Sequence, residues 1–216
     1  MAGTAVFGGS FNPIHYGHLL LADDIRERLS LDQVLFVPAG QPPHKTPVGI
    51  AAASHRYQMV KLAVAGHPGL AVSDLELRRP GPSYTVDTLE ALRLPRQGLF
   101  LLMGSETFLD LLSWRQPRRI AELARFVVIP RTGSAFDTES AAALKVLRDI
   151  GEDRFATVEG GAVPERGVLV VHAASLPISA SDLRRRVREG RSIAYRLPDP
   201  VMAYIRSAGL YRSEAR

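Results

Sequence analysis

Cysteine is absent from this 216-residue chain, and tryptophan occurs only once. Without cysteine the chain forms neither disulfides nor thiolate metal sites, which fits a reducing compartment. No apolar run approaches membrane-spanning length, and the N-terminal residues lack the charged and long apolar regions of a secretion signal. We therefore expect a cytoplasmic protein that makes no contact with membranes.

Basic residues exceed acidic ones, 27 against 22, which gives a net charge of +5. Such a surplus is compatible with nucleic-acid binding, but arginine also suits bidentate recognition of small phosphates. The one basic cluster, Arg184-Arg185-Arg186 with Arg188, gives little support for a nucleic-acid groove. A basic nucleic-acid-binding module therefore remains a remote alternative, and a hydrophobic content of 46% predicts one ordinary domain over residues 1–216.

Glycines and histidines dominate one early stretch, which follows the apolar run Thr4–Phe7 and precedes a helical pattern over Leu19–Leu29. It reads Gly8-Gly9-Ser10-Phe11-Asn12-Pro13-Ile14-His15-Tyr16-Gly17-His18. A tight glycine turn between a strand and a helix N-terminus presents backbone N–H groups to an anion. Taken alone, the histidine pair is equally consistent with a solvated face or a core contact. No third metal ligand stands nearby, and G-x-G-x-x-G is absent, so neither zinc nor the dinucleotide fingerprint is indicated.

Apolar runs alternate with helical patterns along the rest of the chain. We predict strands at 34–37, 70–72, 99–103, 125–129 and 168–171, and helices at 55–65, 85–92, 107–112 and 138–150. Thr85 and Asp199 are predicted helix caps. This alternation predicts an α/β fold: a Rossmann-like open parallel sheet with helices on both faces and a small C-terminal helical part from about residue 179.

Ligands of such sheets bind beyond the carboxyl ends of the strands, so the loops there are candidate site segments. The proline-rich loop 38–47 carries Lys45, which could reach outer phosphates, and Gly104 starts another such loop. Trp114 and Arg115 follow in a polar segment. A lone tryptophan is more often a core anchor, but an exposed indole beside an arginine suits stacking on a flat, negatively charged ring.

The segment Pro177-Ile178-Ser179-Ala180-Ser181-Asp182-Leu183-Arg184 follows the last predicted strand. Ser179 and Asp182 have capping-box spacing, so a helix is expected to begin here. Arg184 lies near the positive end of that helix, where a cation is disfavoured. An anion held between the helix N-terminus and Arg184 would remove this conflict.

These motifs resemble those of the HxGH nucleotidylyltransferases. With V-P-A-G-Q-P-P-H-K, P-S-Y-T and the tail R-L-P-D-P-V-M-A-Y-I-R-S-A-G-L-Y, the chain is similar over nearly its whole length to the bacterial nicotinate mononucleotide adenylyltransferases. The resemblance implies transfer of the adenylyl group of ATP to nicotinate mononucleotide, with Mg²⁺ carried by the triphosphate and no protein-bound metal. Phosphopantetheine adenylyltransferase and cytidylyltransferase activities are the alternatives.

The resemblance and the residue chemistry together give an expected site. We expect this site to bind small molecules and no nucleic acid. The chain is expected to act alone or as a homo-oligomer. Glu106 replaces the aspartate usual in the family and is one methylene longer. Expected catalytic residues are His15, His18 and Arg184; expected ATP contacts are Gly8, Gly9, Ser10, Phe11, His18, Lys45, Gly104, Ile178, Ser179, Ser181 and Arg184; expected mononucleotide contacts are Asn12, His15, Tyr84, Thr85, Glu106, Trp114, Arg115 and Arg131.

Overall fold

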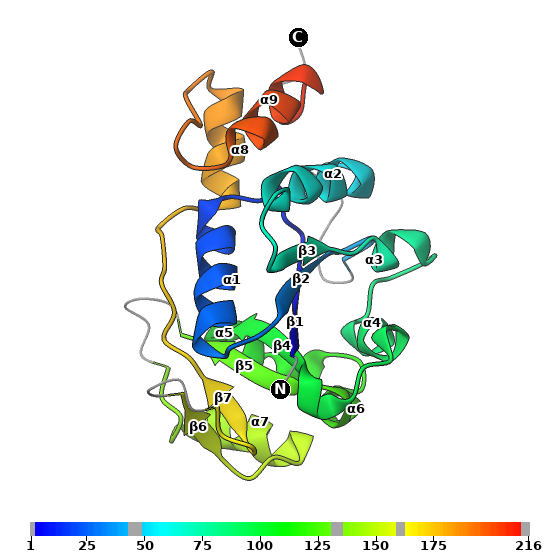
Figure 1. The fold of residues 1–216 in the computed structure, drawn as a ribbon, viewed down its shortest axis with the longest axis vertical. Coiled ribbons are helices and arrows are strands. Elements are labelled where there is room, and N and C mark those ends of the chain that lie inside the picture. Colours follow the sequence, from blue (N-terminus) through cyan, green and yellow to red (C-terminus); the bar gives the residue numbers. More distant parts are fainter. Residues whose placement is uncertain (1–2, 43–48, 131–135, 159–162, 213–216) are drawn as a thin grey trace.

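A parallel sheet forms the centre of the computed structural model, which describes residues 3–42, 49–130, 136–158 and 163–212 (Figure 1). Within these residues the sheet has seven strands in the order β3-β2-β1-β4-β5-β7-β6, and every pairing among them is parallel. The predicted Rossmann-like sheet is confirmed. The strands are β1 (Thr4–Gly9), β2 (Gln33–Pro38), β3 (Leu70–Val72), β4 (Leu99–Gly104), β5 (Arg125–Ile129), β6 (Phe155–Thr157) and β7 (Val168–Val170).

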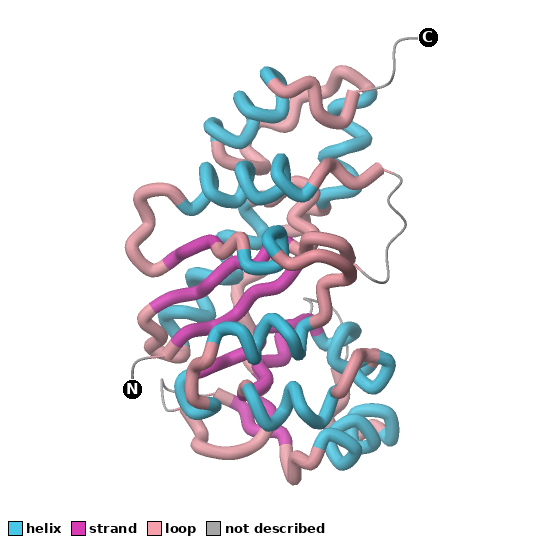
Figure 2. Tube along the Cα trace, turned by 90° about the vertical axis from the view of Figure 1, so that its right-hand side faces the viewer, coloured by secondary structure: helices cyan, strands magenta, loops and turns pink. Residues whose placement is uncertain are grey.

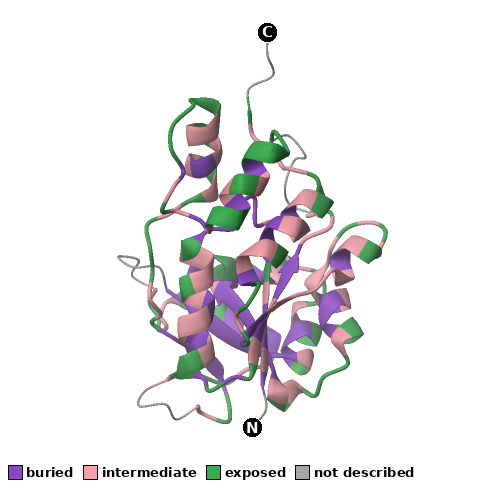
Figure 3. Ribbon diagram, turned by 45° about the horizontal axis from the view of Figure 1, so that its top comes forward, coloured by how far each residue is buried: buried purple, intermediate pink, exposed green. Residues whose placement is uncertain are grey.

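Helices bury both faces of the sheet, because successive strand side chains point to opposite sides. Ala5 and Leu102 enter a core beneath α1 (Tyr16–Arg28), α2 (Ala53–Val64), α8 (Ala180–Arg188) and α9 (Asp199–Ser207). Val6 and Leu101 enter a second core beneath α4 (Thr85–Leu92), α5 (Ser105–Leu109), α6 (Pro117–Leu123) and α7 (Ala141–Ile150). The strands therefore lie buried between two helical layers (Figures 2 and 3).

The strand order reverses between β1 and β4, which continue toward opposite edges of the sheet. Their register pairs Thr4 with Leu99 and ends at Val6 with Leu101, although each strand runs three residues further. The carboxyl ends of β1 and β4 therefore separate. This divergence opens a crevice at the topological switch point, where ligands of open α/β sheets bind.

The C-terminal helices pack on one end of the molecule, where α9 lies beside α2 (Figure 1). Val201 and Ile205 of α9 are buried, and the Tyr204 hydroxyl lies 2.8 Å from Nδ1 of His55 on α2. The predicted helical tail is confirmed. None of the described helices combines the length and apolar character needed to cross a membrane.

Several predicted boundaries were wrong. The first helix begins at Tyr16 rather than Leu19, and the predicted helix 107–112 is α5 followed by a 3₁₀ turn at Leu111–Ser113. The helices α3 (Leu75–Arg78) and α6, and a 3₁₀ turn at Arg96–Gly98, were not predicted, because they are too short to give a periodic pattern.

Two predicted caps were also wrong. Thr85 and Asp199 are the first residues of their helices, so the N-cap positions fall on Tyr84 and Pro198, and neither makes a side-chain cap hydrogen bond. The helix predicted over 138–150 begins at Ala141, because the Ser140 hydroxyl caps it by accepting from the Ala143 N–H at 3.3 Å.

Candidate active site

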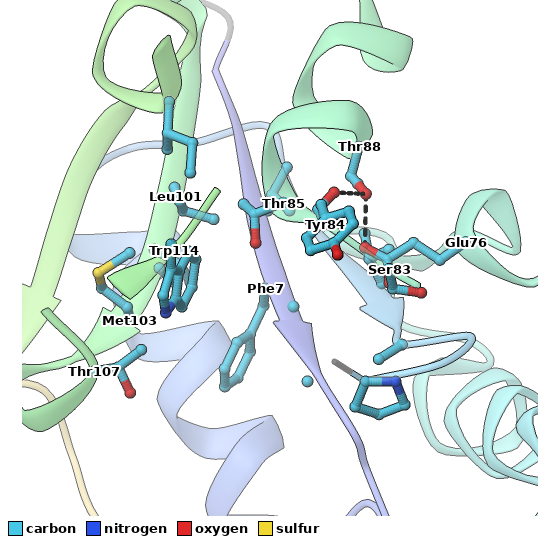
Figure 4. A pocket seen from close by; sticks show the side chains of 18 of the residues that line it. Phe7, Glu76, Ser83, Tyr84, Thr85, Thr88, Leu101, Met103, Thr107 and Trp114 are labelled. Carbon is cyan, nitrogen blue, oxygen red and sulfur yellow. Dashed lines mark hydrogen bonds between the residues drawn. The ribbon is translucent and has the colours of Figure 1, made fainter. Parts of the chain in front are cut away.

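A cavity of about 360 Å³ lies in the crevice between β1 and β4 (Figure 4). Its walls come from the carboxyl ends of both strands, the loop after β2, the start of α4 and the loop before α6. The predicted site residues that line it are Gly8, Gly9, Ser10, Tyr84, Thr85, Gly104, Trp114 and Arg115. Phe7 and Glu76, which were not predicted as site residues, also line it. The structure thus gathers eight of the predicted site residues around one space.

Aromatic rings form the flat walls of this cavity. Trp114 and Phe7 lie on facing sides in Figure 4, and Trp114 also packs against the core beneath α6. The indole is partly buried rather than exposed as expected, because this packing covers one part of it. The guanidinium carbon of Arg115 lies 4.8 Å from the ring centroid of Tyr84, which places a cation at the same cavity. The cavity is therefore suited to a planar ring that carries negative charge.

The N-terminus of α4 reaches the cavity through Tyr84 and Thr85. The N-cap residue Tyr84 makes no side-chain cap hydrogen bond, so the first backbone N–H groups of the helix keep their capacity to donate, and the helix dipole adds positive character there. A carboxylate bound beside Thr85 would complete the helix terminus.

Glu76 and Thr88 line the cavity but were not predicted. The Glu76 side chain is only 7% exposed, and its Oε1 accepts a hydrogen bond from the Thr88 hydroxyl at 2.7 Å. Arg79 Nη2 donates to the Thr88 hydroxyl at 3.1 Å and to the Tyr84 carbonyl at 3.3 Å. This network fixes the start of α4. The one available signal was an acidic residue between Leu75 and Leu77, in a segment for which no element was predicted.

The two histidines of the first motif lie close to Phe7. The rings of His15 and His18 are stacked, with centroids 3.7 Å apart and an interplanar angle of 25°. The rings of Phe7 and Phe11 meet His18 at centroid distances of 6.0 and 5.2 Å. A Cβ on Gly17 would lie 3.0 Å from Nδ1 of His15, so glycine leaves the room that this stack needs.

Both histidines are uncharged near neutral pH. Burial lowers the pKa of His15 from 6.5 to about 4, and burial together with the nearby His15 lowers the pKa of His18 to about 3. The Nδ1 atoms of both rings are buried and find no hydrogen-bond partner among the described residues. Neutral imidazoles with unused polar atoms are suited to hydrogen bonding with phosphate oxygens, and a bound anion would favour their protonation.

The predicted glycine turn was wrong in its location. Gly8 and Gly9 belong to β1, and the chain turns instead at Phe11, whose φ is 44°, followed by a cis Asn12–Pro13 peptide bond. A Cβ on Gly8 would meet no atom within 4 Å, so the missing side chain leaves open space in the cavity. Gly8 and Gly9 therefore leave the end of β1 without side chains, and the chain turns only after them.

The C-terminal motif meets the first motif through Arg184, whose Nη1 donates to the Asn12 carbonyl at 2.8 Å. The predicted start of α8 is confirmed. Ser179 is its N-cap, and the Ser179 hydroxyl accepts from the Asp182 N–H at 3.2 Å and lies 3.1 Å from the Ser181 hydroxyl. Arg184 therefore ties α8 to the loop that precedes the two histidines.

Arg56 is a further residue that sequence reasoning missed. It is 1% exposed, and its guanidinium donates to the carbonyls of Ala51, Ser10, Ala39 and Gly40 at 2.9, 2.9, 2.5 and 3.2 Å. It therefore ties the loops that follow β1 and β2 to each other. Burial lowers its pKa.

Some predicted residues lie away from the cavity wall or outside the described residues. Glu106 is exposed on α5, and Ile178 is partly buried against the core at the start of α8. Lys45 and Arg131 fall outside the residues that the structure describes. Within those residues, no group of three or more His, Cys, Asp or Glu is placed to hold a metal ion.

The fold is that of a nucleotidyltransferase, and the model of the cytidylyltransferase-like family matches residues 6–186. The probable nicotinate-nucleotide adenylyltransferase of Thermomicrobium roseum is 44% identical, over 99% of this chain and 93% of the relative. One from Thermus thermophilus is 44% identical over 96% of this chain and 98% of its own length. The chain therefore belongs to the nicotinate-nucleotide adenylyltransferase family.

A solved structure supports the fold. The nicotinic acid mononucleotide adenylyltransferase of Plasmodium falciparum, complexed with NaAD, superposes with a TM-score of 0.71 over 98% of both chains. At 18% identity this likeness shows the shared fold alone.

Proposed function

We propose that this chain transfers the adenylyl group of ATP to nicotinate mononucleotide, giving nicotinate adenine dinucleotide and pyrophosphate. One observation carries the proposal: Phe7 lines the cavity walled by Trp114 and Tyr84 and also contacts His18 of the first motif. A planar acceptor in the cavity and a nucleotide at the histidines would meet at the end of β1. The family relationship supports the same assignment.

In this reaction an oxygen of the mononucleotide phosphate forms a bond to the α-phosphorus of ATP. The bond from that phosphorus to the bridging oxygen of pyrophosphate breaks, and the electron pair leaves with pyrophosphate. No protein nucleophile is needed. Catalysis rests on positioning and on stabilisation of the charge that develops on the phosphates.

Each predicted residue keeps a proposed role. His18 donates to the α-phosphate and His15 to the phosphate assembly, while Arg184 and Lys45 stabilise the leaving pyrophosphate. Trp114 stacks on the pyridine ring of the mononucleotide. The carboxylate of that ring binds at the α4 N-terminus and at the Arg115 backbone. The remaining ATP contacts are Gly8, Gly9, Ser10, Phe11, Gly104, Ile178, Ser179 and Ser181, and the remaining mononucleotide contacts are Asn12, Tyr84, Thr85, Glu106 and Arg131.

The working enzyme is proposed to be a single domain over residues 1–216 that acts in the cytoplasm on small molecules, alone or as a homo-oligomer. Mg²⁺ is proposed to enter with ATP, coordinated by the phosphates, where it would neutralise part of their charge.

Steady-state kinetics test the proposal. ATP and CTP are each offered with nicotinate mononucleotide, nicotinamide mononucleotide and phosphopantetheine, and pyrophosphate release is measured. The highest kcat/KM is expected for ATP with nicotinate mononucleotide, and a preference for CTP or phosphopantetheine would overturn the assignment. His18→Ala should lower kcat at least about tenfold, which corresponds to about 1.4 kcal/mol of transition-state stabilisation.

A further inference from the structure

We propose that Tyr211, just beyond α9, is a positioning residue for the nucleotide site and acts through Asn12. The Tyr211 hydroxyl lies 2.7 Å from Oδ1 of Asn12, although the two residues are 199 positions apart in the chain. Burial raises the pKa of Tyr211, so its hydroxyl keeps its proton and donates to the amide oxygen. The inference rests on the proposed function and adds a residue that was not among the expected site residues.

The Asn12 side chain is held by two segments of the chain, the loop before α2 and the C-terminal tail. Its Nδ2 donates to the Gly49 carbonyl at 3.0 Å, and its Oδ1 accepts from the Ala51 N–H at 3.1 Å as well as from Tyr211. An amide oxygen has two lone pairs, and these two donors use both. Asn12 is 5% exposed, so loss of either donor would leave one lone pair of a buried acceptor without a hydrogen bond.

The main chain around Asn12 is held in the same way. Arg184 donates to the Asn12 carbonyl at 2.8 Å, and Arg56 donates to the Ser10 carbonyl at 2.9 Å. Phe11 between them adopts a left-handed φ of 44°, a conformation that persists only where the surroundings enforce it. These contacts fix the path of the loop from the cavity wall at Ser10 to the histidine at position 15. Tyr211 supplies one of them from the far end of the chain.

A second tail tyrosine provides a matched control. The Tyr204 hydroxyl lies 2.8 Å from Nδ1 of His55, a contact of nearly the same length that joins α9 to α2. Neither Tyr204 nor His55 is an expected site residue, and neither lines the cavity. Removing either hydroxyl deletes one hydrogen bond of the C-terminal tail, but only the bond from Tyr211 ends on the first motif.

The experiment compares Tyr211→Phe with Tyr204→Phe. Urea unfolding measures stability, steady-state kinetics measure kcat and KM for each substrate, and calorimetry measures the Kd for ATP. Both variants should lose stability to a similar extent. Only Tyr211→Phe should weaken ATP binding and lower kcat/KM for ATP, by about three- to tenfold, the range expected for one hydrogen bond.

Two results would overturn the inference: ATP binding and kcat/KM of Tyr211→Phe within twofold of wild type, or equal losses in Tyr204→Phe. A double variant tests the route through Asn12. In an Asn12→Ala background, Tyr211→Phe should add less than twofold, and a full additional loss would show that Tyr211 acts elsewhere.

The Kd for ATP separates this inference from the proposed function. If the wild-type chain binds ATP but does not use nicotinate mononucleotide, the proposed acceptor is wrong, while the ratio of the ATP Kd values for the two variants still decides the role of Tyr211.

Discussion

Acidification should destabilise this protein through the stacked pair His15 and His18. Burial lowers the pKa of His15 to about 4 and of His18 to about 3, whereas both rings titrate near 6.5 once unfolding exposes them. As pH falls, protons therefore bind the unfolded chain first. The stability contributed by the neutral pair is complete above about pH 6.5, and is lost progressively toward pH 4 for His15 and pH 3 for His18.

The change from pH 7 to pH 5 gives a measurable magnitude. pH 5 lies about 1.5 units below the unfolded pKa, and each unit corresponds to about 1.4 kcal/mol. Each histidine should thus lower the free energy of unfolding by about 2 kcal/mol, and the pair by about 4 kcal/mol. Carboxylates also begin to bind protons as the pH approaches 5. The loss of unfolding free energy in wild type must therefore be compared with the loss in a variant that lacks both histidines.

Urea unfolding followed by circular dichroism at pH 7 and pH 5 provides the assay. The variant is His15→Asn with His18→Asn, and the control is His172→Asn, whose side chain is exposed in a loop. The control should lose as much stability as wild type, and the double variant about 4 kcal/mol less. Equal losses in wild type and double variant would refute the view that these rings are desolvated and neutral.

Three further substitutions test other parts of the site. Trp114→Ala should raise KM for the mononucleotide about tenfold and leave KM for ATP unchanged, since the indole is the proposed stacking wall for the pyridine ring and is not a proposed ATP contact. The reverse pattern in steady-state kinetics would contradict this. Gly8→Ala should fold normally, because a Cβ at this position meets no atom within 4 Å. The added methyl group should nevertheless raise the KM of a substrate about tenfold, because it fills cavity space. The melting temperature checks folding and steady-state kinetics check binding, and an unchanged KM would argue against this role. Arg56→Met should lower the free energy of unfolding by about 3 kcal/mol, because four carbonyl groups lose their hydrogen-bond donor. Urea titration measures this loss, and a value below about 1 kcal/mol would contradict the prediction.

Much of the fold could be predicted because its signals are local. The run Leu99–Met103 is apolar at every position, as expected of a strand buried on both faces, and it forms most of β4. Ser179 marked the start of α8, because a cap and the helix it begins lie within four residues. Short elements such as α3 gave no such signal and were missed.

The chain by itself also determined which residue types bear the chemistry: two histidines three apart, an arginine near a helix start and a tryptophan in a polar loop. Only the tertiary structure decided how they meet. It stacked His15 on His18, placed Phe7 between that pair and the cavity, and directed the Asn12 amide toward Gly49, Ala51 and Tyr211. The physical reason is that contacts such as Tyr211 with Asn12 join distant segments through packing of the sheet and its helices, and packing of that kind leaves no periodic or local pattern in the sequence.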